Sequence, residues 1–312
     1  MATVEFDDVT KTYLGATQNA VDHVSFSVEK GALCILLGTS GSGKTTLLRM
    51  VNRLVPMSEG AIRLEGEDIT RLEPVALRRR IGYVVQSIGL FPHWTIAQNI
   101  ATVPRLLHWP ETRIAERVRE LLALMRLDPG TTAERYPHQL SGGQQQRVGV
   151  ARALAADPDV LLMDEPFGAL DPITREELRI ELGRIHQATG KTILFVTHDI
   201  DSALEAADVI AILRNGALVQ FGTPAEILAR PADDFVRDFV GGAALGLKLL
   251  AQRRVAERLR PEPRPEGTPI PGDATLTEAL SQMVLRGTDR LPVSDENGRI
   301  TGSVALADMI AP

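Results

Sequence analysis

Short apolar runs and alternating stretches divide the chain into predicted strands. Continuous apolar runs bounded by polar or glycine-rich segments are typical of strands that are buried on both faces of a parallel sheet. They occur at residues 33–37, 81–85, 160–163 and 193–196. Residues 4–6 and 24–28 alternate apolar and polar side chains instead, which predicts strands of a half-exposed antiparallel sheet. A further strand and turn are expected at residues 61–69, so the pattern predicts an α/β fold.

Helical spacing and capping residues predict the segments between these strands. One apolar stripe, which we interpret as core, consists of Ile114, Val118, Leu121, Leu122 and Met125. Capping residues predict helices that begin after Ser141, Asp171 and Thr223, and the first of these is expected to end at Asp157. Asn215 and Gly216 predict a type I′ turn between two short strands.

A glycine-rich turn connects the first buried strand to a predicted helix. Between a strand and a helix, such a turn is typical of a loop that binds phosphate, because glycines let backbone N–H groups converge on an anion. We expect Lys44 to contact the β- and γ-phosphates of a nucleotide, and the Thr45 hydroxyl to bind Mg²⁺. The loop consists of Gly38, Thr39, Ser40, Gly41, Ser42, Gly43, Lys44, Thr45 and Thr46.

Two acids, Asp164 and Glu165, end another buried strand. Carboxylates in this position are unfavourable without a compensating charge, which Mg²⁺ beside a nucleotide supplies. We therefore expect Asp164 in the metal shell, and Glu165 to polarise the water that attacks the γ-phosphate. His198 follows the strand at 193–196, and ligands of open α/β sheets gather at that edge, so His198 is expected to donate a hydrogen bond to phosphate.

A second phosphate-contacting surface is predicted at residues 141–144. Gly142 and Gly143 follow the cap Ser141 directly, although each glycine costs a helix about 1 kcal/mol relative to alanine. A bare backbone at the positive end of a helix is favourable where an anion approaches it closely.

Two other residues have open interpretations. Tyr13 is either a base-stacking residue or an ordinary loop tyrosine. Helix capping alone accounts for Asp171.

Composition limits the possible functions. The 312 residues carry a formal net charge of −6, which argues against nucleic acid as the main partner. Cys34 is the single cysteine, and a chain without a disulfide framework fits a reducing cytoplasm. The N-terminus does not resemble a secretory signal, and no apolar run approaches the length of a membrane span. A membrane function would require a partner that supplies the membrane part.

Taken in order, these motifs resemble the nucleotide-binding subunit of an ABC transporter. The resemblance covers roughly residues 3–240, and residues 140–144 are its most specific part. It implies a P-loop NTPase of ABC type with a mostly parallel core sheet, an antiparallel β subdomain and a helical subdomain at about residues 92–158.

The resemblance also implies roles for individual residues. Tyr13 would stack on adenine, and Gln86 would join Mg²⁺ to the groove that faces the transporter, as a metal-shell and catalytic residue beside Glu165 and His198. Asp171 would lie at the nucleotide. Ser141, Gly142, Gly143 and Gln144 would cover the ATP that is bound to a second copy of the chain, so both sites of a homodimer are expected to hydrolyse ATP.

Three stretches narrow the resemblance to importers of glycine betaine, choline and related osmoprotectants: residues 81–96, 135–140 and 230–236. The implied partners are integral membrane permease subunits and, indirectly, a periplasmic or extracellular solute-binding protein. The implied location is peripheral, at the cytoplasmic face of the inner (plasma) membrane. An ATPase of another small-solute importer, for amino acids or sulfonates, is the main alternative. A soluble ABC protein without transport and a phosphate-loop kinase or GTPase outside this family are further alternatives.

The tail departs from the tandem CBS motifs of many such subunits. Residues 241–270 are expected to form a basic helix and a proline-rich linker. Residues 271–312 resemble CBS sequence but have room for only about one motif. We leave open whether this small α/β tail binds an adenosyl ligand, senses ionic strength or only dimerises.

Overall fold

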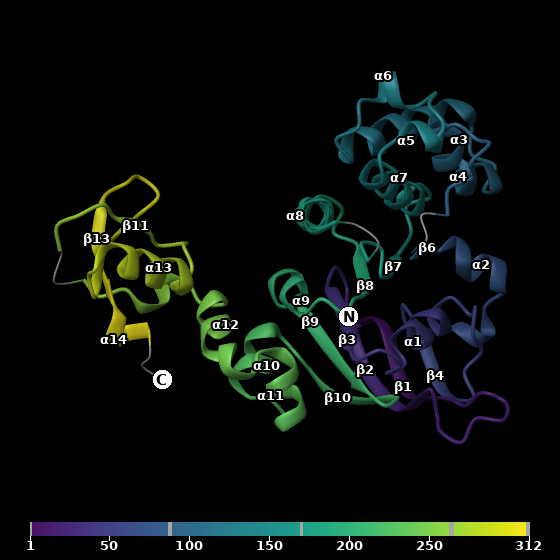
Figure 1. Cartoon of the computed structure of the whole chain (residues 1–312). Helices are drawn as coiled ribbons and strands as arrows, with labels where there is room; N and C mark the ends of the chain where they lie inside the picture. Colours follow the sequence, from purple (N-terminus) through teal and green to yellow (C-terminus); the bar gives the residue numbers. More distant parts are fainter. Residues whose placement is uncertain (1, 87–88, 169–170, 262–264, 310–312) are drawn as a thin grey trace. The chain divides into compact units, whose positions relative to one another are not determined.

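The computed structural model describes residues 2–86, 89–168, 171–261 and 265–309. Its internal contacts divide the chain into two compact units, Met1–Thr223 and Pro224–Pro312 (Figure 1). Ser87 and Ile88 of the osmoprotectant-like stretch and Pro263 of the expected linker lie outside the described residues. In the part that is described, no helix has the length and apolar character needed to cross a bilayer.

In the part of the chain that the structure describes, a six-stranded sheet forms the centre of the first unit. Its strand order is β10-β9-β3-β8-β7-β6. Its five parallel strands confirm the predicted core, and β10 joins β9 antiparallel. Asn215 and Gly216 turn between β9 and β10 with φ of 52° and 86°, as a type I′ turn requires. The strands are β3 (Leu33–Gly38), β6 (Ile81–Val84), β7 (Val160–Asp164), β8 (Thr192–Val196), β9 (Val209–Arg214) and β10 (Ala217–Gly222).

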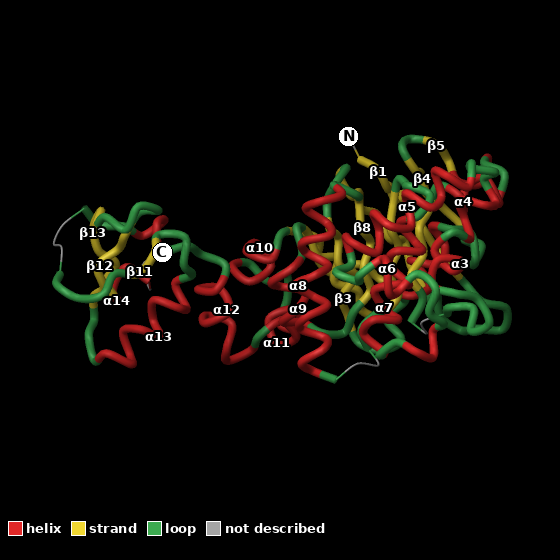
Figure 2. Tube along the Cα trace, turned by 90° about the horizontal axis from the view of Figure 1, so that it is seen from above, coloured by secondary structure: helices red, strands yellow, loops and turns green. Residues whose placement is uncertain are grey.

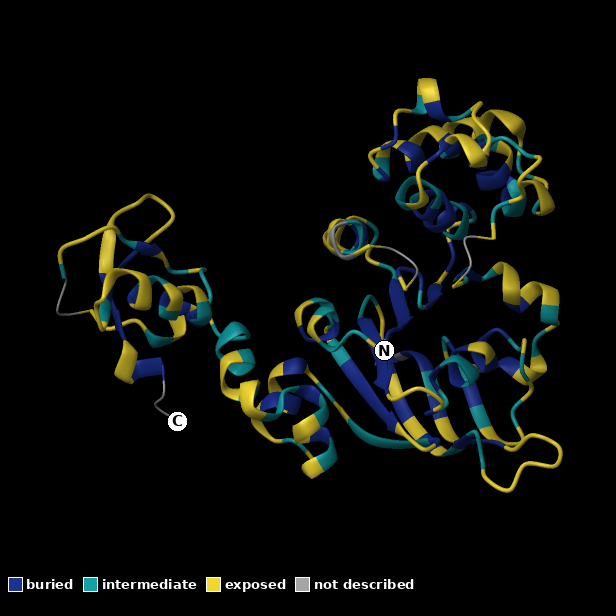
Figure 3. Cartoon of the chain, viewed as in Figure 1, coloured by how far each residue is buried: buried dark blue, intermediate teal, exposed yellow. Residues whose placement is uncertain are grey.

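All residues of β3, β7 and β8 are buried, as their continuous apolar sequences predict (Figure 3). In α8 (Pro172–Thr189) the apolar side chains of Leu178, Leu182 and Ile185 are buried. Four α-helices follow strands or turns of this part of the unit: α1 (Lys44–Val51), α2 (Pro74–Arg79), α8 (Pro172–Thr189) and α9 (Ile200–Ala206).

An antiparallel sheet in the order β2-β1-β4-β5 confirms the alternation seen near the N-terminus. Phe6 pairs with Phe26, and their rings stack with centroids 4.5 Å apart. Alternate residues of β2 are buried and share one hydrophobic core with β3 and α1. The strands are β1 (Ala2–Lys11), β2 (Val21–Glu29), β4 (Glu59–Leu64) and β5 (Glu67–Asp68), and the 3-10 helix η1 (Ile69–Arg71) follows.

Helices fill the stretch that we expected to form a helical subdomain (Figure 2). The predicted stripe is buried along α5 and its C-cap, Met125. The helix after Ser141 ends at Leu154, earlier than predicted, and Asp157 has a φ of 57°, which no right-handed helix allows. The elements are α3 (Ile96–Ile100), α4 (Thr102–Leu106), α5 (Glu111–Leu124), α6 (Pro129–Thr132), η2 (Pro137–Gln139) and α7 (Gly142–Leu154).

The second unit has a core of its own, which includes Val255, Leu276, Met283 and Leu291. Its described sheet has the order β11-β12-β13, with β11 parallel and β13 antiparallel to β12. The elements are α10 (Pro224–Ala229), α11 (Asp234–Val240), η3 (Gly242–Ala244), α12 (Leu245–Ala251), η4 (Val255–Arg258), β11 (Ile270–Pro271), α13 (Leu276–Arg286), β12 (Arg290–Ser294), β13 (Ile300–Ala305) and α14 (Leu306–Met309).

Part of the segment expected to be a basic helix packs into this second unit instead. Val255 is fully buried in its core, and Arg260 exchanges two backbone hydrogen bonds of 2.8 Å with Ser303. Asp308 is buried and pairs with the Arg260 guanidinium. Backbone pairing and core packing therefore tie residues 255–260 to the second unit, which the basic composition of this segment did not indicate.

Candidate functional site

The phosphate loop has the backbone that its sequence predicts. It leaves β3 at Gly38 and enters α1 at Lys44, and Gly38, Gly41 and Gly43 have φ of 152°, 77° and 96°. A Cβ atom at Gly38 would lie 2.2 Å from the carbonyl oxygen of Leu213. Only glycine fits this path, and without a Cβ atom at these positions the turn can present backbone N–H groups to an anion. The loop therefore fits a phosphate group.

The loop that carries Tyr13 lies directly against the phosphate loop. A Cβ atom at Gly43 would be 2.3 Å from the Ala20 carbonyl oxygen. Tyr13 itself is 45% exposed, and the Lys11 ammonium lies 4.9 Å from the centroid of its ring. The ring is exposed on a loop whose last residue touches the phosphate loop, and its role in base stacking remains a prediction.

Lys44 is folded over the phosphate loop. Its Nζ donates to the carbonyl oxygens of Gly38 and Thr39, both at 2.8 Å, and lies 3.4 Å from Ser42 Oγ. Burial lowers the pKa of the Lys44 ammonium, and the negative charges of Glu165 and Asp164 oppose this shift. The cation is therefore held at the loop, beside both acids.

The two predicted metal ligands from α1 and β7 meet at the edge of the sheet. Thr45 Oγ1 donates to Asp164 Oδ1 over 2.8 Å. This separation is close to the roughly 2.9 Å between neighbouring ligands of an octahedral Mg²⁺ ion with bonds of about 2.0–2.1 Å. No cluster of three or more His, Cys, Asp or Glu side chains suited to a metal occurs among the described residues. A hydroxyl and one carboxylate, completed by phosphate and water oxygens, nevertheless fit Mg²⁺.

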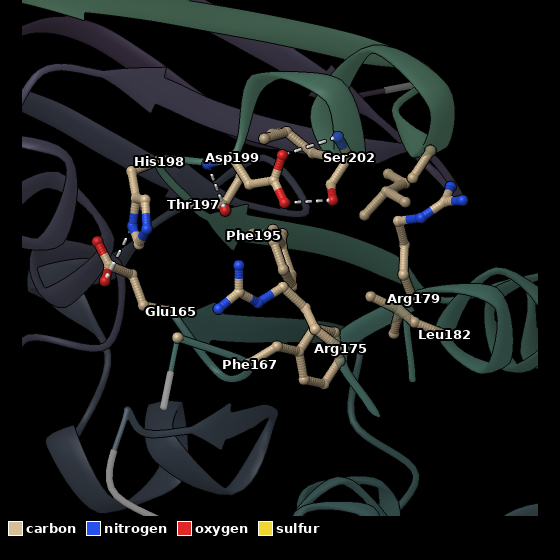
Figure 4. Close-up of a pocket in the computed structure, with 14 residues that line it drawn as sticks. Glu165, Phe167, Arg175, Arg179, Leu182, Phe195, Thr197, His198, Asp199 and Ser202 are labelled. Carbon is tan, nitrogen blue, oxygen red and sulfur yellow. Dashed lines mark hydrogen bonds and ion pairs between the residues drawn. The ribbon is translucent and has the colours of Figure 1, made fainter. Parts of the chain in front are cut away.

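Glu165 and His198 face each other across the ends of β7 and β8 (Figure 4). His198 Nδ1 lies 3.4 Å from Glu165 Oε2. Glu165 has a φ of 44°, and a left-handed backbone at a residue other than glycine is a strain that is common at functional sites. Both residues line a cavity of about 30 Å³ that extends toward Phe167 and Phe195. The cavity is too small for a nucleotide, whose place would be at the phosphate loop.

Two further residues, which the sequence alone did not identify, contact the Asp164 carboxylate. Arg49 Nη2 lies 3.2 Å from Asp164 Oδ2, and the Tyr83 hydroxyl donates to the same oxygen over 3.3 Å. Arg49 follows Thr45 by four residues on α1, a spacing that places both on one helix face and was a usable signal. Tyr83 had no such signal, because its proximity depends on the pairing of β6 with β7.

The residues of the predicted second phosphate surface form the tip of α7. Ser141 Oγ accepts from the Gln144 N–H over 3.3 Å, and Gln144 Oε1 accepts from the Ser141 N–H over 3.0 Å, which confirms the capping box. Ser141 and Gly142 are exposed. A Cβ atom at Gly143 would lie 2.9 Å from the Thr174 methyl carbon, so packing against α8 provides a second reason for this glycine.

Asp171 and Gln86 are less informative about a nucleotide. Asp171 caps α8 and accepts from the Thr174 N–H over 3.0 Å, so its structural role is confirmed and its role at ATP remains a prediction. Gln86 is exposed just beyond the end of β6. Its predicted link between Mg²⁺ and a transporter also remains a prediction.

Two family models match the chain. The model described as ABC transporter matches residues 21–168, which hold the phosphate loop, the capping box at Ser141 and both acids. The model described as CBS domain matches residues 263–311.

Curated relatives and a solved structure agree with these matches. The glycine betaine uptake system ATP-binding protein YehX of Escherichia coli (strain K12) is 52% identical over 98% of this chain and 99% of its own length. The glycine betaine/carnitine/choline transport ATP-binding protein OpuCA of Bacillus subtilis (strain 168) is 47% identical over 96% of this chain and 78% of its own length. An ATP-binding cassette solved as a dimer in a post-hydrolysis state with ADP and Pi has a TM-score of 0.63 and 32% identity, covering 71% of this chain and 98% of that one.

Proposed function

The chain belongs to the family of ABC transporter ATP-binding subunits, and we propose that it powers the import of an osmoprotectant such as glycine betaine or choline. It is an ATPase whose turnover is coupled to transport. The observation that carries the proposal is the convergence of the phosphate loop, the pair of acids and His198 at the carboxyl ends of β3, β7 and β8. In open α/β sheets this edge is where ligands bind.

The arrangement of these residues supports a separate role for each of them in ATP hydrolysis. The glycine turn and Lys44 hold the β- and γ-phosphates, because the turn presents backbone N–H groups and the ammonium adds a point charge. Glu165 acts as the base that polarises the attacking water, and a negative carboxylate held at the strand end suits this task. His198, which lies beside Glu165, hydrogen-bonds the γ-phosphate. Tyr13 stacks on the adenine.

We assign Mg²⁺ to the oxygens of Thr45 and Asp164, with Gln86 at the edge of the shell. Bound Mg²⁺ would neutralise part of the charge that develops on the transferred phosphoryl group. Asp164 suits this position because its buried carboxylate already lies against the Thr45 hydroxyl.

A homodimer completes each site in this proposal. Ser141 and Gly142 are exposed at the tip of α7, and a helix N-terminus with bare glycines favours an anion. We infer that Ser141, Gly142, Gly143 and Gln144 of one copy, together with its Asp171, approach the ATP of the other copy. A related cassette has been solved as a dimer with ADP and Pi, which supports this assembly.

The membrane partners follow from the family. We propose integral membrane permease subunits as the docking partners and a solute-binding protein as the cargo carrier, with this chain at the cytoplasmic face of the membrane. The named functions of the relatives from E. coli and B. subtilis support a betaine, carnitine or choline cargo. In our domain assignment, residues 1–240 form the motor, residues 241–270 connect it to the tail, and residues 271–312 are a single CBS-like motif.

The catalytic assignment is tested by Glu165→Gln, which removes the charge with almost no change of shape. The variant should retain ATP binding and accumulate the ATP-bound dimer while single-turnover phosphate release stalls. The exposed Glu177 on α8 offers a matched control, since Glu177→Gln should release phosphate at the wild-type rate. Unimpaired release by Glu165→Gln would refute the assigned base.

The cargo is tested separately in cells with and without this subunit at high osmolarity. Uptake of radiolabelled glycine betaine or choline should depend on the subunit and on an intact Glu165. Loss of taurine or amino-acid uptake, with betaine and choline uptake unchanged, would instead support the alternative importers.

A further inference from the structure

The carboxylate of Asp164 is occupied on both oxygens. Oδ1 accepts from Thr45, while Oδ2 accepts from Arg49 and from the Tyr83 hydroxyl at 3.2 and 3.3 Å. The side chain is only 2% exposed. A buried carboxylate with free oxygens is unfavourable, so these donors stabilise the ionised group. As a result, Oδ1 contacts the Thr45 hydroxyl, whereas Oδ2 contacts Arg49 and Tyr83.

The two donors on Oδ2 come from different elements of the fold. Arg49 extends from α1, the helix that follows the phosphate loop. Tyr83 extends from β6, which pairs with the strand that ends in Asp164. Because one donor belongs to a helix and the other to the neighbouring strand, rotation of the carboxylate about its terminal torsion would break both hydrogen bonds. That torsion is otherwise broad in aspartate.

We propose that Arg49 and Tyr83 are positioning residues for the metal ion: they hold Asp164 Oδ2 so that Oδ1 stays beside the Thr45 hydroxyl. The inference rests on the proposed function, because it concerns the Mg²⁺ of that site. Mg²⁺ demands near-ideal octahedral geometry, so a carboxylate that is fixed in advance binds it more tightly. Partners in the outer shell of metal sites typically change metal affinity by roughly 10–100-fold.

Charge compensation alone is the competing explanation for these contacts. If Arg49 and Tyr83 only made the burial of Asp164 tolerable, removing them would lower the thermal stability of the chain without a specific effect on metal. If they position Oδ1, the affinity for the metal in the presence of nucleotide falls, while nucleotide binding without metal is unchanged. Metal-dependent and metal-free binding therefore distinguish the two roles.

The experiment uses the full chain, with Mn²⁺ in place of Mg²⁺ and a non-hydrolysable ATP analogue. Electron paramagnetic resonance measures free and bound Mn²⁺, and a fluorescent nucleotide measures binding in EDTA. Tyr83→Phe, which deletes only the hydroxyl, should weaken Mn²⁺ binding roughly tenfold. Arg49→Met should weaken it at least as much, and Arg49→Lys, which keeps the charge, should recover part of the loss. Tyr136→Phe, at a tyrosine of the helical segment that is 40% exposed, is the control and should bind Mn²⁺ as the wild type does.

Three results would count against the inference in distinguishable ways. Wild-type Mn²⁺ affinity in both Tyr83→Phe and Arg49→Met would show that the two residues do not position the carboxylate, and would leave the proposed function intact. A wild-type chain that binds nucleotide equally with and without Mn²⁺ would remove the metal assignment itself, and the inference with it. A lowered melting temperature without a change in Mn²⁺ affinity would favour charge compensation alone.

Discussion

Gly43 is the position where the structure makes the sharpest prediction about the phosphate loop. It opens α1 with a φ of 96°, and a Cβ atom there would lie 2.3 Å from the Ala20 carbonyl oxygen and 3.4 Å from a methyl carbon of Val21. Alanine at this position therefore meets two separate penalties. Its backbone prefers a negative φ, and its methyl group collides with main-chain atoms that cannot rotate away.

The two penalties can be estimated separately. A left-handed backbone at alanine costs roughly 1–2 kcal/mol, and forcing a methyl group into a packed interior costs roughly 1–3 kcal/mol. For a sum near the middle of this range, about 3 kcal/mol, the Tm of a domain of about 150–250 residues falls by roughly 6–12 °C. The displaced loop also binds phosphate less well, because its N–H groups no longer converge.

Gly41→Ala is the matched control in the same loop. Gly41 has a φ of 77° and nothing within 4 Å of a Cβ atom, so this change meets only the backbone penalty of roughly 1–2 kcal/mol. Thermal unfolding of both variants, with and without ATP, separates the contributions. Gly43→Ala should melt well below Gly41→Ala and lose the stabilisation that ATP confers by mass action. Equal melting temperatures would refute the close packing of Gly43 on Ala20.

Three further predictions concern the nucleotide, the dimer and the tail. Lys44→Ala should weaken ATP binding by about 30-fold or more, since it removes a buried cation from the phosphate site; a fluorescent-nucleotide titration at near wild-type affinity would contradict its assignment. Ser141→Arg should leave ATP binding by the monomer intact but prevent the ATP-dependent dimer, which light scattering detects; a dimer that still forms would show that the tip of α7 does not approach the second copy. Arg260→Met should destabilise the second unit by roughly 1–3 kcal/mol in urea, because Asp308 is buried and loses its partner. The double change with Asp308→Asn should recover part of that loss, and no recovery would argue against a direct pairing.

Buried strands, helix caps and tight turns could be predicted from residues that are close together in the sequence. The apolar runs of β3, β7 and β8 identified buried parallel strands, because burial on both faces requires apolar side chains at every position. The cap at Ser141 and the type I′ turn at Asn215 were predictable for a similar reason. Each depends on hydrogen bonds or dihedral angles within a few residues.

The contacts between distant segments were decided only by the tertiary structure. Tyr83 reaches Asp164 because β6 lies beside β7, and nothing in residues 81–85 specifies that neighbour. Gly143 packs against Thr174, although its sequence context suggested only an approaching anion. Val255 is buried in the core of the second unit, although the segment around it is basic. Periodicity and capping depend on the immediate neighbours of a residue, whereas strand order and packing depend on burial to which the whole chain contributes. The sequence therefore determined the elements, and the folded chain decided which of them meet.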